Sequence, residues 1–219
     1  MRTVLGAPLL WASCRDLLAP VSEKRVSRFR RLAVYCGSSD DVGEVYRDAA
    51  RELGRLLATR GIGMVYGGGK VGLMGICADA ALAGGGEVIG VIPHKLEALE
   101  VGHEGLSEKI VVDSMHARKM VMASLSDGFV AMPGGFGTLD ELAEVTTWNQ
   151  LGYHKKPTGL LNVRGYFDHL LAFARHASEV GFIRPVHRGL WVHAAEPEAL
   201  LDAMAAQDLS GLQGWLERP

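Results

Sequence analysis

The sequence predicts an α/β fold in which a Rossmann-like, doubly wound parallel sheet lies between two layers of helices. Short, almost continuously apolar runs alternate along the chain with amphipathic stretches of helical period. This alternation is typical of parallel strands that are buried on both faces and joined by helices. Several apolar runs end in glycine-rich turns, and no internal repeat or low-complexity linker divides the pattern. We therefore expect one three-layer α/β/α domain.

Six strands and six helices follow from this alternation. The apolar runs predict strands over residues 32–36, 62–66, 87–92, 109–112, 129–132 and 158–162. The amphipathic stretches predict helices over residues 44–59, 71–83, 115–125, 139–151, 166–180 and 197–216. Gly61 stops the first helix, Ser114 caps the third, and Pro93 closes the third strand. Residues 94–107 show no clear period, so we expect a loop over the ligand site there.

Size and composition limit both the number of domains and the classes of function. With 219 residues, 48% of them hydrophobic, the chain can bury one ordinary core, which we expect over residues 32–219. The net charge of −2 gives no basic excess, which argues against a nucleic-acid scaffold. No apolar run reaches the roughly 18 residues of a membrane-spanning helix. Three widely spaced cysteines without a CxxC pair indicate a reducing compartment, so we expect a cytoplasmic protein.

The first 31 residues differ from the rest of the chain. Residues 1–12 are mildly apolar behind Arg2, and a basic cluster follows over residues 24–31. A secretory signal is the alternative, but Trp11 stands where a cleavage site requires a small residue, and only one basic residue precedes the apolar stretch. We expect a flexible, solvated extension over residues 1–31.

One glycine-rich turn, Pro133-Gly134-Gly135-Phe136-Gly137-Thr138, follows the fifth predicted strand and opens a helix. The first N–H groups of a helix have no partner within it, so a helix N-terminus after a bare backbone turn attracts an anion. The glycines allow the backbone to approach a phosphate closely, and Thr138 adds a hydroxyl group. This turn therefore predicts a bound phosphorylated ligand.

Glu141 lies just beyond these glycines and has two possible roles. Thr138-x-x-Glu141 fits a capping box, in which the carboxylate reaches back to a backbone N–H. The same carboxylate is also within reach of a ligand held at the turn, where it could take part in catalysis. Spacing alone does not decide between the two.

A second glycine-rich turn, Gly67-Gly68-Gly69-Lys70-Val71-Gly72, follows the second predicted strand. It matches GxGxxG, but the next strand ends in Ile92-Pro93-His94, without the acid that binds a dinucleotide ribose. It is not a P-loop either, because Val71 follows the lysine in place of Ser or Thr. We interpret this turn as a place where phosphate or ribose approaches the backbone. Gly37-Ser38-Ser39 ends the first strand, and all three turns should converge at one edge of the sheet.

The segment Ser114-Met115-His116-Ala117-Arg118-Lys119 opens another helix at the carboxyl end of a strand. Cations near a helix N-terminus oppose the helix dipole, which is tolerated most easily when an anion lies opposite them. We expect Arg118, and with it Lys119, to bind a phosphate or carboxylate. His116 is interpreted as a solvated or packing residue.

Together these residues resemble the LONELY GUY (LOG) family of cytokinin-activating phosphoribohydrolases. The resemblance spans residues 32–185, and its signature is the PGGxGTxxE element at residues 133–141. The other matching pieces are Cys36-Gly37-Ser38-Ser39, Tyr66-Gly67-Gly68-Gly69, Gly72-Leu73-Met74-Gly75, Gly90-Val91-Ile92-Pro93, Ser114-Met115-His116-x-Arg118-Lys119, Thr147-Trp148-x-Gln150-Leu151-Gly152 and Lys156-Pro157. Such members have often been labelled "lysine decarboxylase", but neither Lys70 nor Lys119 has the setting of a pyridoxal-phosphate lysine.

The resemblance implies hydrolysis of the N-glycosidic bond of cytokinin nucleoside 5′-monophosphates to free base and ribose 5-phosphate. It requires no metal and no cofactor, and it implies a homodimer that completes the pocket. The family's catalytic arginine and glutamate correspond to Arg118 and Glu141. With the turn residues, the expected substrate contacts are Ser38, Gly68, Gly69, Glu100, Met115, Arg118, Lys119, Gly134, Gly135, Phe136, Gly137, Thr138, Leu139, Asp140, Glu141 and Thr146. Two alternatives remain: a general AMP nucleosidase, and a non-catalytic nucleotide-binding or carrier protein on the same fold.

Overall fold

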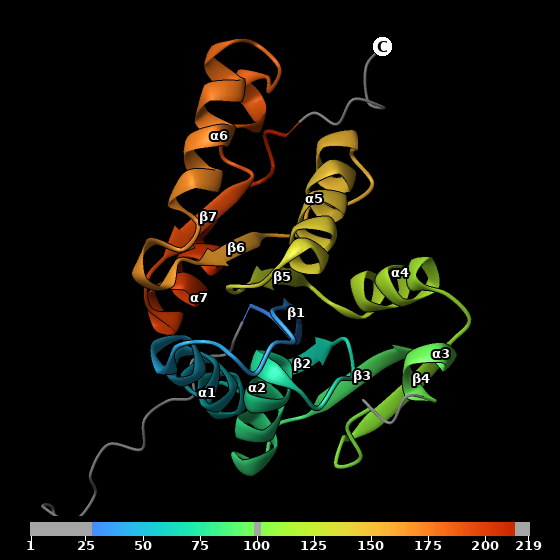
Figure 1. The fold of residues 1–219 in the computed structure, drawn as a ribbon. Helices are drawn as coiled ribbons and strands as arrows, with labels where there is room; N and C mark the ends of the chain where they lie inside the picture. The colour runs from blue at the N-terminus through green and yellow to red at the C-terminus, as the bar shows by residue number, and fades with distance from the viewer. Residues whose placement is uncertain (1–27, 99–101, 213–219) are drawn as a thin grey trace, which may run out of the picture.

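The computed structural model describes residues 28–98 and 102–212 (Figure 1). Its strands are β1 (Arg31–Tyr35), β2 (Gly63–Tyr66), β3 (Val88–Pro93), β4 (Glu108–Val112), β5 (Gly128–Ala131), β6 (Thr158–Leu161) and β7 (Trp191–Ala194). Its α-helices are α1 (Glu44–Thr59), α2 (Gly72–Ala83), α3 (His94–Glu97), α4 (Met115–Leu125), α5 (Phe136–Leu151), α6 (Asp168–Glu179) and α7 (Pro197–Ala206). Two short 3₁₀ helices, η1 (Val163–Gly165) and η2 (Pro185–His187), complete the order.

The strands form one parallel sheet in the order β4-β3-β2-β1-β5-β6-β7. β1 and β5 lie side by side in register, from Leu32 opposite Gly128 to Tyr35 opposite Ala131. The chain winds from β1 outward to β4, then returns to the centre and winds the other way to β7, so the strand order reverses between β1 and β5. The predicted doubly wound sheet is confirmed, and this reversal is where such sheets bind ligands.

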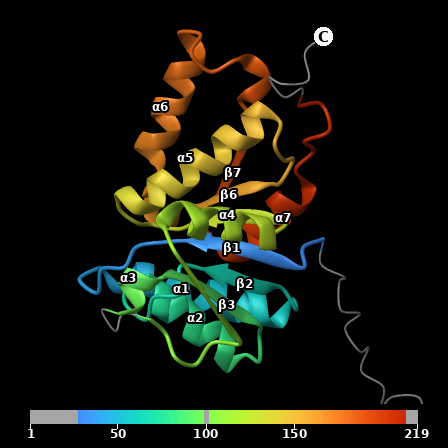
Figure 2. The same ribbon diagram turned by 90° about the vertical axis from the view of Figure 1, so that its right-hand side faces the viewer.

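Helices cover both faces of the sheet, as the two views show (Figures 1 and 2). On one face, α1, α2 and α7 bury side chains such as Leu53, Cys77 and Leu200 in one core cluster. On the other face, α4 and α5 pack against the central strands, and the start of α6 packs with α5 near β6. Burial of apolar strand residues on both faces is the main stabilising contribution, which explains why these strands lack alternating polar positions.

Apart from the two 3₁₀ helices and shifts of one or two residues at the ends of elements, four details differ from the elements predicted from sequence. β7 was not predicted, because its short, half-exposed Trp-Val-His-Ala run gives little signal. The expected loop at 94–107 begins with the one-turn helix α3, and β4 starts at Glu108, directly after it. α5 begins at Phe136, three residues before the predicted start, because Gly137 is already part of the helix and Gly135 is its N-cap. α7 ends at Ala206, well before residue 216.

The segment before β1 already packs on the domain. Phe29 is buried in the core, and Arg28 Nη1 donates to the carbonyl of Ala205 at 2.6 Å. Packed residues therefore begin before Leu32, while residues 1–27 of the predicted extension lie outside the described residues. Across residues 28–98 and 102–212, no helix has both the length and the apolar character needed to cross a membrane.

Candidate active site

Three turns meet where the strand order reverses. The N–H of Gly37, after β1, donates to the carbonyl of Pro133, after β5, at 3.0 Å. The carbonyl of Gly37 accepts from Leu73 N at 3.0 Å, which joins the start of α2 to the same point. Gly72 has a φ of +61°, and a Cβ there would collide with the backbone of Ser38, so this close approach requires glycine. The predicted convergence of the turns is confirmed.

The turn after β5 presents bare backbone at a helix start. Gly135 is the N-cap residue of α5, and Gly135, Phe136 and Gly137 are exposed. Within the described part of the chain, the N–H groups of residues 135–138 donate to no protein acceptor. They lie at the positive end of the sixteen-residue helix α5, an arrangement that suits a phosphate.

The capping-box interpretation of Glu141 is wrong. A capping box requires Thr138 at the N-cap, but α5 starts at Phe136 and Thr138 is already its third residue. The Thr138 side chain is buried, and its Oγ1 lies against the Cα of Gly134, where a Cβ would collide with it. Glu141 is therefore free of the capping role.

Arg118 is buried on the first turns of α4, although it carries a permanent charge. Ser114 caps this helix as predicted, since its Oγ accepts from Ala117 N at 3.1 Å. The guanidinium lies directly on Gly67 at the end of β2, where a Cβ would collide with it. Its Nη1 is 3.8 Å from Met115 Sδ, and its Nε has no hydrogen-bond partner among the described residues. A buried guanidinium with spare donors fits an anionic ligand.

Glu141 and Arg118 influence each other across the site. Burial raises the pKa of Glu141 to about 7; the charge of Arg118 opposes this rise, whereas Asp140 and Glu144 add to it. Among the described residues, Glu141 and Arg118 form no ion pair within 4 Å, so the charges of the two groups interact over a longer distance. A carboxyl group with such a pKa exchanges protons readily near neutral pH.

Lys119 connects α4 to α5. Its Nζ lies 3.0 Å from Asp140 Oδ2 and 3.1 Å from Glu144 Oε2. Although burial lowers the pKa of Lys119, the hydrogen bonds to Asp140 and Glu144 raise it above its usual value. The two carboxylates flank Glu141 on α5, so Lys119 is held beside the site by protein groups. Its role as a substrate contact stays a prediction.

The turn after β2 is covered by neighbouring residues. The carbonyl of Gly68 accepts from His103 N at 2.8 Å, and Gly69 forms a single antiparallel bridge with Gly102. His103 is itself held by Asp79, 2.9 Å from its Nε2. Gly68 and Gly69 are buried, so this segment closes over the turn after β2. The adjacent Gly67 belongs to the turn that was expected to approach phosphate or ribose, and the group that lies against it is the Arg118 guanidinium.

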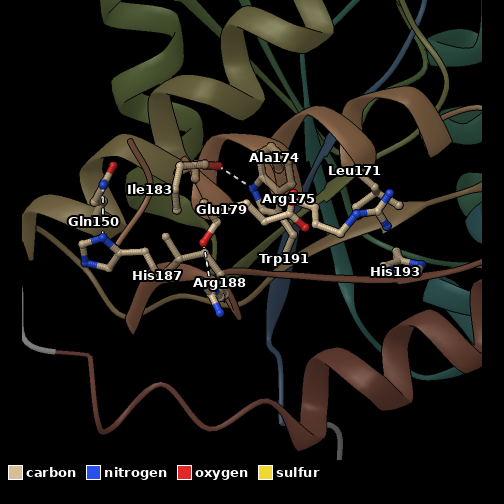
Figure 3. A pocket seen from close by; sticks show the side chains of 13 residues that line it. Gln150, Leu171, Ala174, Arg175, Glu179, Ile183, His187, Arg188, Trp191 and His193 are labelled. Carbon is tan, nitrogen blue, oxygen red and sulfur yellow. Dashed lines mark hydrogen bonds between the residues drawn. The ribbon is translucent and has the colours of Figure 1, made fainter. Parts of the chain in front are cut away.

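Glu100 and Thr146 are two further expected substrate contacts. Glu100 lies outside the described residues. Thr146 is on another face of α5, where its Oγ1 donates to the Leu142 carbonyl at 2.6 Å and accepts from Trp191 Nε1 at 2.7 Å. It lines a separate cavity of about 530 Å³ between α5, α6 and β7, which also contains Gln150 and His187 (Figure 3). The role of Thr146 as a substrate contact also stays a prediction.

Exposed apolar side chains surround the site. Met115 at the start of α4 is 46% exposed, and Leu139 and Phe136 at the start of α5 are 36% and 91% exposed. An apolar rim beside a polar, anion-binding centre suits a ligand that has a phosphate at one end and an apolar base at the other.

The arrangement combines an anion site, a buried cation and a carboxyl group that titrates near neutral pH. Such a set can hold a phosphorylated ligand and stabilise positive charge that develops near Glu141. In the part of the chain that the structure describes, no group of three or more His, Cys, Asp or Glu side chains is arranged to hold a metal ion.

Known proteins have sequences related to that of this chain. A family model described as "Possible lysine decarboxylase" matches residues 74–204. The chain is 55% identical over 175 residues to the probable cytokinin riboside 5′-monophosphate phosphoribohydrolase LOGL9 of Oryza sativa subsp. japonica, covering 80% of this chain and 77% of that protein. It is 48% identical over 180 residues to the cytokinin riboside 5′-monophosphate phosphoribohydrolase LOG5 of Arabidopsis thaliana, covering 82% and 79%.

Solved structures share the fold at lower identity. The molybdenum cofactor binding protein of Rippkaea orientalis has a TM-score of 0.61 at 25% identity, covering 80% of this chain and 95% of that one. The Moco carrier protein of Chlamydomonas reinhardtii has a TM-score of 0.60 at 26% identity, covering 80% and 95%. With about half of its residues identical to the plant proteins over most of both lengths, the chain belongs to the LOG family of cytokinin riboside 5′-monophosphate phosphoribohydrolases.

Proposed function

We propose that this protein hydrolyses the N-glycosidic bond of cytokinin nucleoside 5′-monophosphates and releases the free base and ribose 5-phosphate. The observation that carries the proposal is Glu141, a half-buried carboxyl group near the start of α5, whose pKa is raised to about 7 by burial although the charge of the buried Arg118 opposes the rise. The names of relatives at about 50% identity support the same reaction.

The reaction requires stabilisation of a sugar cation and activation of water. As the bond between C1′ and the base nitrogen breaks, its electron pair leaves with the base, and positive charge develops on the ribose. Ionised Glu141 stabilises this charge and accepts a proton from the water whose oxygen bonds to C1′. The departing base takes up one proton, so water is divided between the two products. Positioned proton transfer of this kind contributes on the order of 10²–10⁴ in rate.

Binding groups place C1′ beside that carboxyl group. The N–H groups of residues 135–138 hold the 5′-phosphate at the helix N-terminus, and Thr138 completes this turn. Arg118 binds the phosphate or ribose from the opposite side and keeps Glu141 partly ionised. This division of roles explains why the site needs both a fixed cation and a carboxyl group that titrates near neutral pH.

Two further features belong to the proposal. We infer a homodimer, because the exposed Met115, Phe136 and Leu139 leave an apolar rim that a second copy can cover. We also infer a cytoplasmic location, because Cys36 and Cys77 are free thiols, as is usual in a reducing compartment. Size-exclusion chromatography with light scattering tests the first inference, and imaging of a fluorescent fusion in the native cell tests the second.

A non-catalytic carrier is the second candidate, because solved structures of the same fold are named as molybdenum cofactor carriers. A protein that only binds a phosphorylated ligand has no use for a carboxyl group held near a phosphate, so Arg118 with Glu141 favours the hydrolase. Incubation with AMP and with N6-isopentenyl-AMP, followed by chromatography for free base and ribose 5-phosphate, separates the candidates. A cytokinin-specific enzyme has the higher kcat/KM for the prenylated nucleotide, a general nucleosidase favours AMP or neither, and a carrier releases no base.

A further inference from the structure

Tyr166, which follows β6 and η1 in the chain, contacts the glycine-rich turn after β5. Tyr166 Oη donates to the carbonyl of Gly134 at 2.7 Å, across 32 residues of sequence. We propose that Tyr166 is a positioning residue of the phosphate site, whose hydrogen bond directs the backbone N–H of Gly135 toward the ligand's 5′-phosphate. This inference rests on the proposed function for its ligand, but its test does not depend on turnover.

The direction of the Gly135 N–H follows from the geometry of the peptide bond. The amide between Gly134 and Gly135 is planar and trans, so its C=O and N–H point in opposite directions. The preceding carbonyl, that of Pro133, is also held, because it accepts from Gly37 N at 3.0 Å. Two successive carbonyl groups are thus fixed by protein donors, and the Gly135 N–H is directed to the other side, at the N-cap of α5.

Such fixation matters in a turn made of glycines. Gly135 has no neighbouring atom within 4 Å of the place where a Cβ would stand, so packing does not restrict its backbone on that side. Glycine populates a wider range of backbone angles than other residues, and an unrestrained peptide unit there can rotate its N–H away from the ligand. The Tyr166 hydroxyl supplies the missing restraint.

The turn that carries Tyr166 is built to place it there. Arg164 has a φ of +53° and Gly165 a φ of +74°, so the chain makes two consecutive left-handed steps just before the tyrosine. Asn162 braces this turn: its Oδ1 accepts from Phe167 N at 2.7 Å, and its Nδ2 donates to Asp168 Oδ1 at 2.8 Å. A left-handed arginine is costly and persists only where the surrounding structure imposes it, often at functional sites.

Aromatic packing fixes the ring independently of its hydroxyl group. Tyr46 of α1 packs edge-on against Tyr166 with ring centroids 5.8 Å apart, and Phe167 does so at 5.1 Å. Tyr166→Phe therefore keeps these contacts and removes only the hydrogen bond to Gly134. Tyr46→Phe is the matched control, because it alters the same aromatic cluster without touching the phosphate turn.

The experiment measures ligand binding by calorimetry in the Glu141→Gln background, where substrate is not consumed. AMP and ribose 5-phosphate are the probes, because both carry the 5′-phosphate and only one carries a base. Tyr166→Phe should weaken both by the same factor, about three- to tenfold, which is what one orienting hydrogen bond contributes. Tyr46→Phe should change neither. In the active enzyme, Tyr166→Phe should raise KM by a similar factor and leave kcat nearly unchanged.

Three outcomes would overturn the proposal. The first is equal AMP affinity of the Tyr166→Phe and Tyr46→Phe proteins. The second is weaker binding of AMP with unchanged binding of ribose 5-phosphate, which would place the effect at the base. The third is a lower kcat with unchanged KM. If the wild-type protein released no base while Tyr166→Phe still weakened both probes, the proposed reaction would fail and the positioning role of Tyr166 would stand.

Discussion

In the turn after β2, Gly67, Gly68 and Gly69 are buried beneath other parts of the protein, whereas in the turn after β5 a side chain at Gly135 or Gly137 would meet open space. The first turn lets protein groups approach: the Arg118 guanidinium on Gly67, and residues 102–103 on Gly68 and Gly69. The second leaves its N–H groups for a ligand. Two similar glycine clusters therefore differ in structure: one lies against the Arg118 guanidinium, and the other leaves its N–H groups exposed for the proposed phosphate.

Of the two glycine turns, the buried one has the larger expected effect, which a single added methyl group reveals. Gly67→Ala places a Cβ where the Arg118 guanidinium lies, so the guanidinium must move while the backbone can remain. We expect kcat/KM for the nucleotide to fall by about 100-fold, as when an important electrostatic group is displaced. Circular dichroism should show an unchanged fold. Activity near that of wild type would mean that the position of Arg118 on Gly67 is irrelevant to catalysis.

The next effect is on stability and concerns the carboxyl group beside the exposed turn. The pKa of Glu141 is raised to about 7 in the folded protein, above its ordinary value of 4.5. The folded state then binds more protons than the unfolded state between these two values, so this group makes stability fall as pH rises through that window. Glu141→Gln removes this effect. The free energy of unfolding of the variant relative to wild type should therefore be higher at pH 8 than at pH 4, by about 1–3 kcal/mol.

Urea denaturation of wild type and Glu141→Gln at both pH values measures this difference. Glu52, an exposed glutamate on α1, provides the matched Glu→Gln control, and its substitution should leave the pH dependence unchanged. Parallel pH dependence of Glu141→Gln and wild type would contradict a raised pKa of Glu141 in the folded protein.

A third, smaller effect tests the link between α4 and α5. Lys119→Met removes the charge that lowers the pKa of Glu141 and leaves Asp140 and Glu144, which raise it, without their partner. The acid limb of the pH profile of kcat/KM should move to higher pH, and activity at pH 7 should fall roughly five- to tenfold. An unchanged acid limb with a higher KM would instead assign Lys119 to direct substrate binding.

The smallest effect is expected at the exposed turn itself. Gly137→Ala keeps the backbone N–H, and its Cβ meets no protein atom within 4 Å. We expect KM to rise by no more than about threefold, with kcat and thermal stability unchanged, since alanine suits a helix at least as well as glycine. A loss as large as that of Gly67→Ala would remove the distinction between the two turns.

Much of the fold follows from the sequence because its signals are local. The apolar runs of β1 to β6 and the amphipathic α1 have periods that the chain displays directly, and their carboxyl-end turns meet as predicted. β7 could not be predicted in this way, because its four half-exposed residues show no clear period. The start of α5 could not be predicted either, because glycines in a turn before a helix and glycines inside its first turn look alike in sequence.

The site was less accessible to sequence reasoning, because its decisive features are contacts between distant residues. Spacing alone left Glu141 between capping and catalysis, and only the start of α5 at Phe136 excludes the cap. Nothing in the sequence near Gly67 indicates that Arg118 lies on it. Thr146 lies on the face of α5 that contacts Trp191, a residue of the strand β7, which was not predicted.

The central claim is that Glu141 acts on the ribose of a nucleotide whose phosphate is held beside it. The most direct test compares Glu141→Gln with wild type for AMP or N6-isopentenyl-AMP, measuring both turnover and binding. We predict that affinity stays within a few-fold while turnover falls by about 10²–10⁴. Hydrolysis by Glu141→Gln at the wild-type rate would contradict this account.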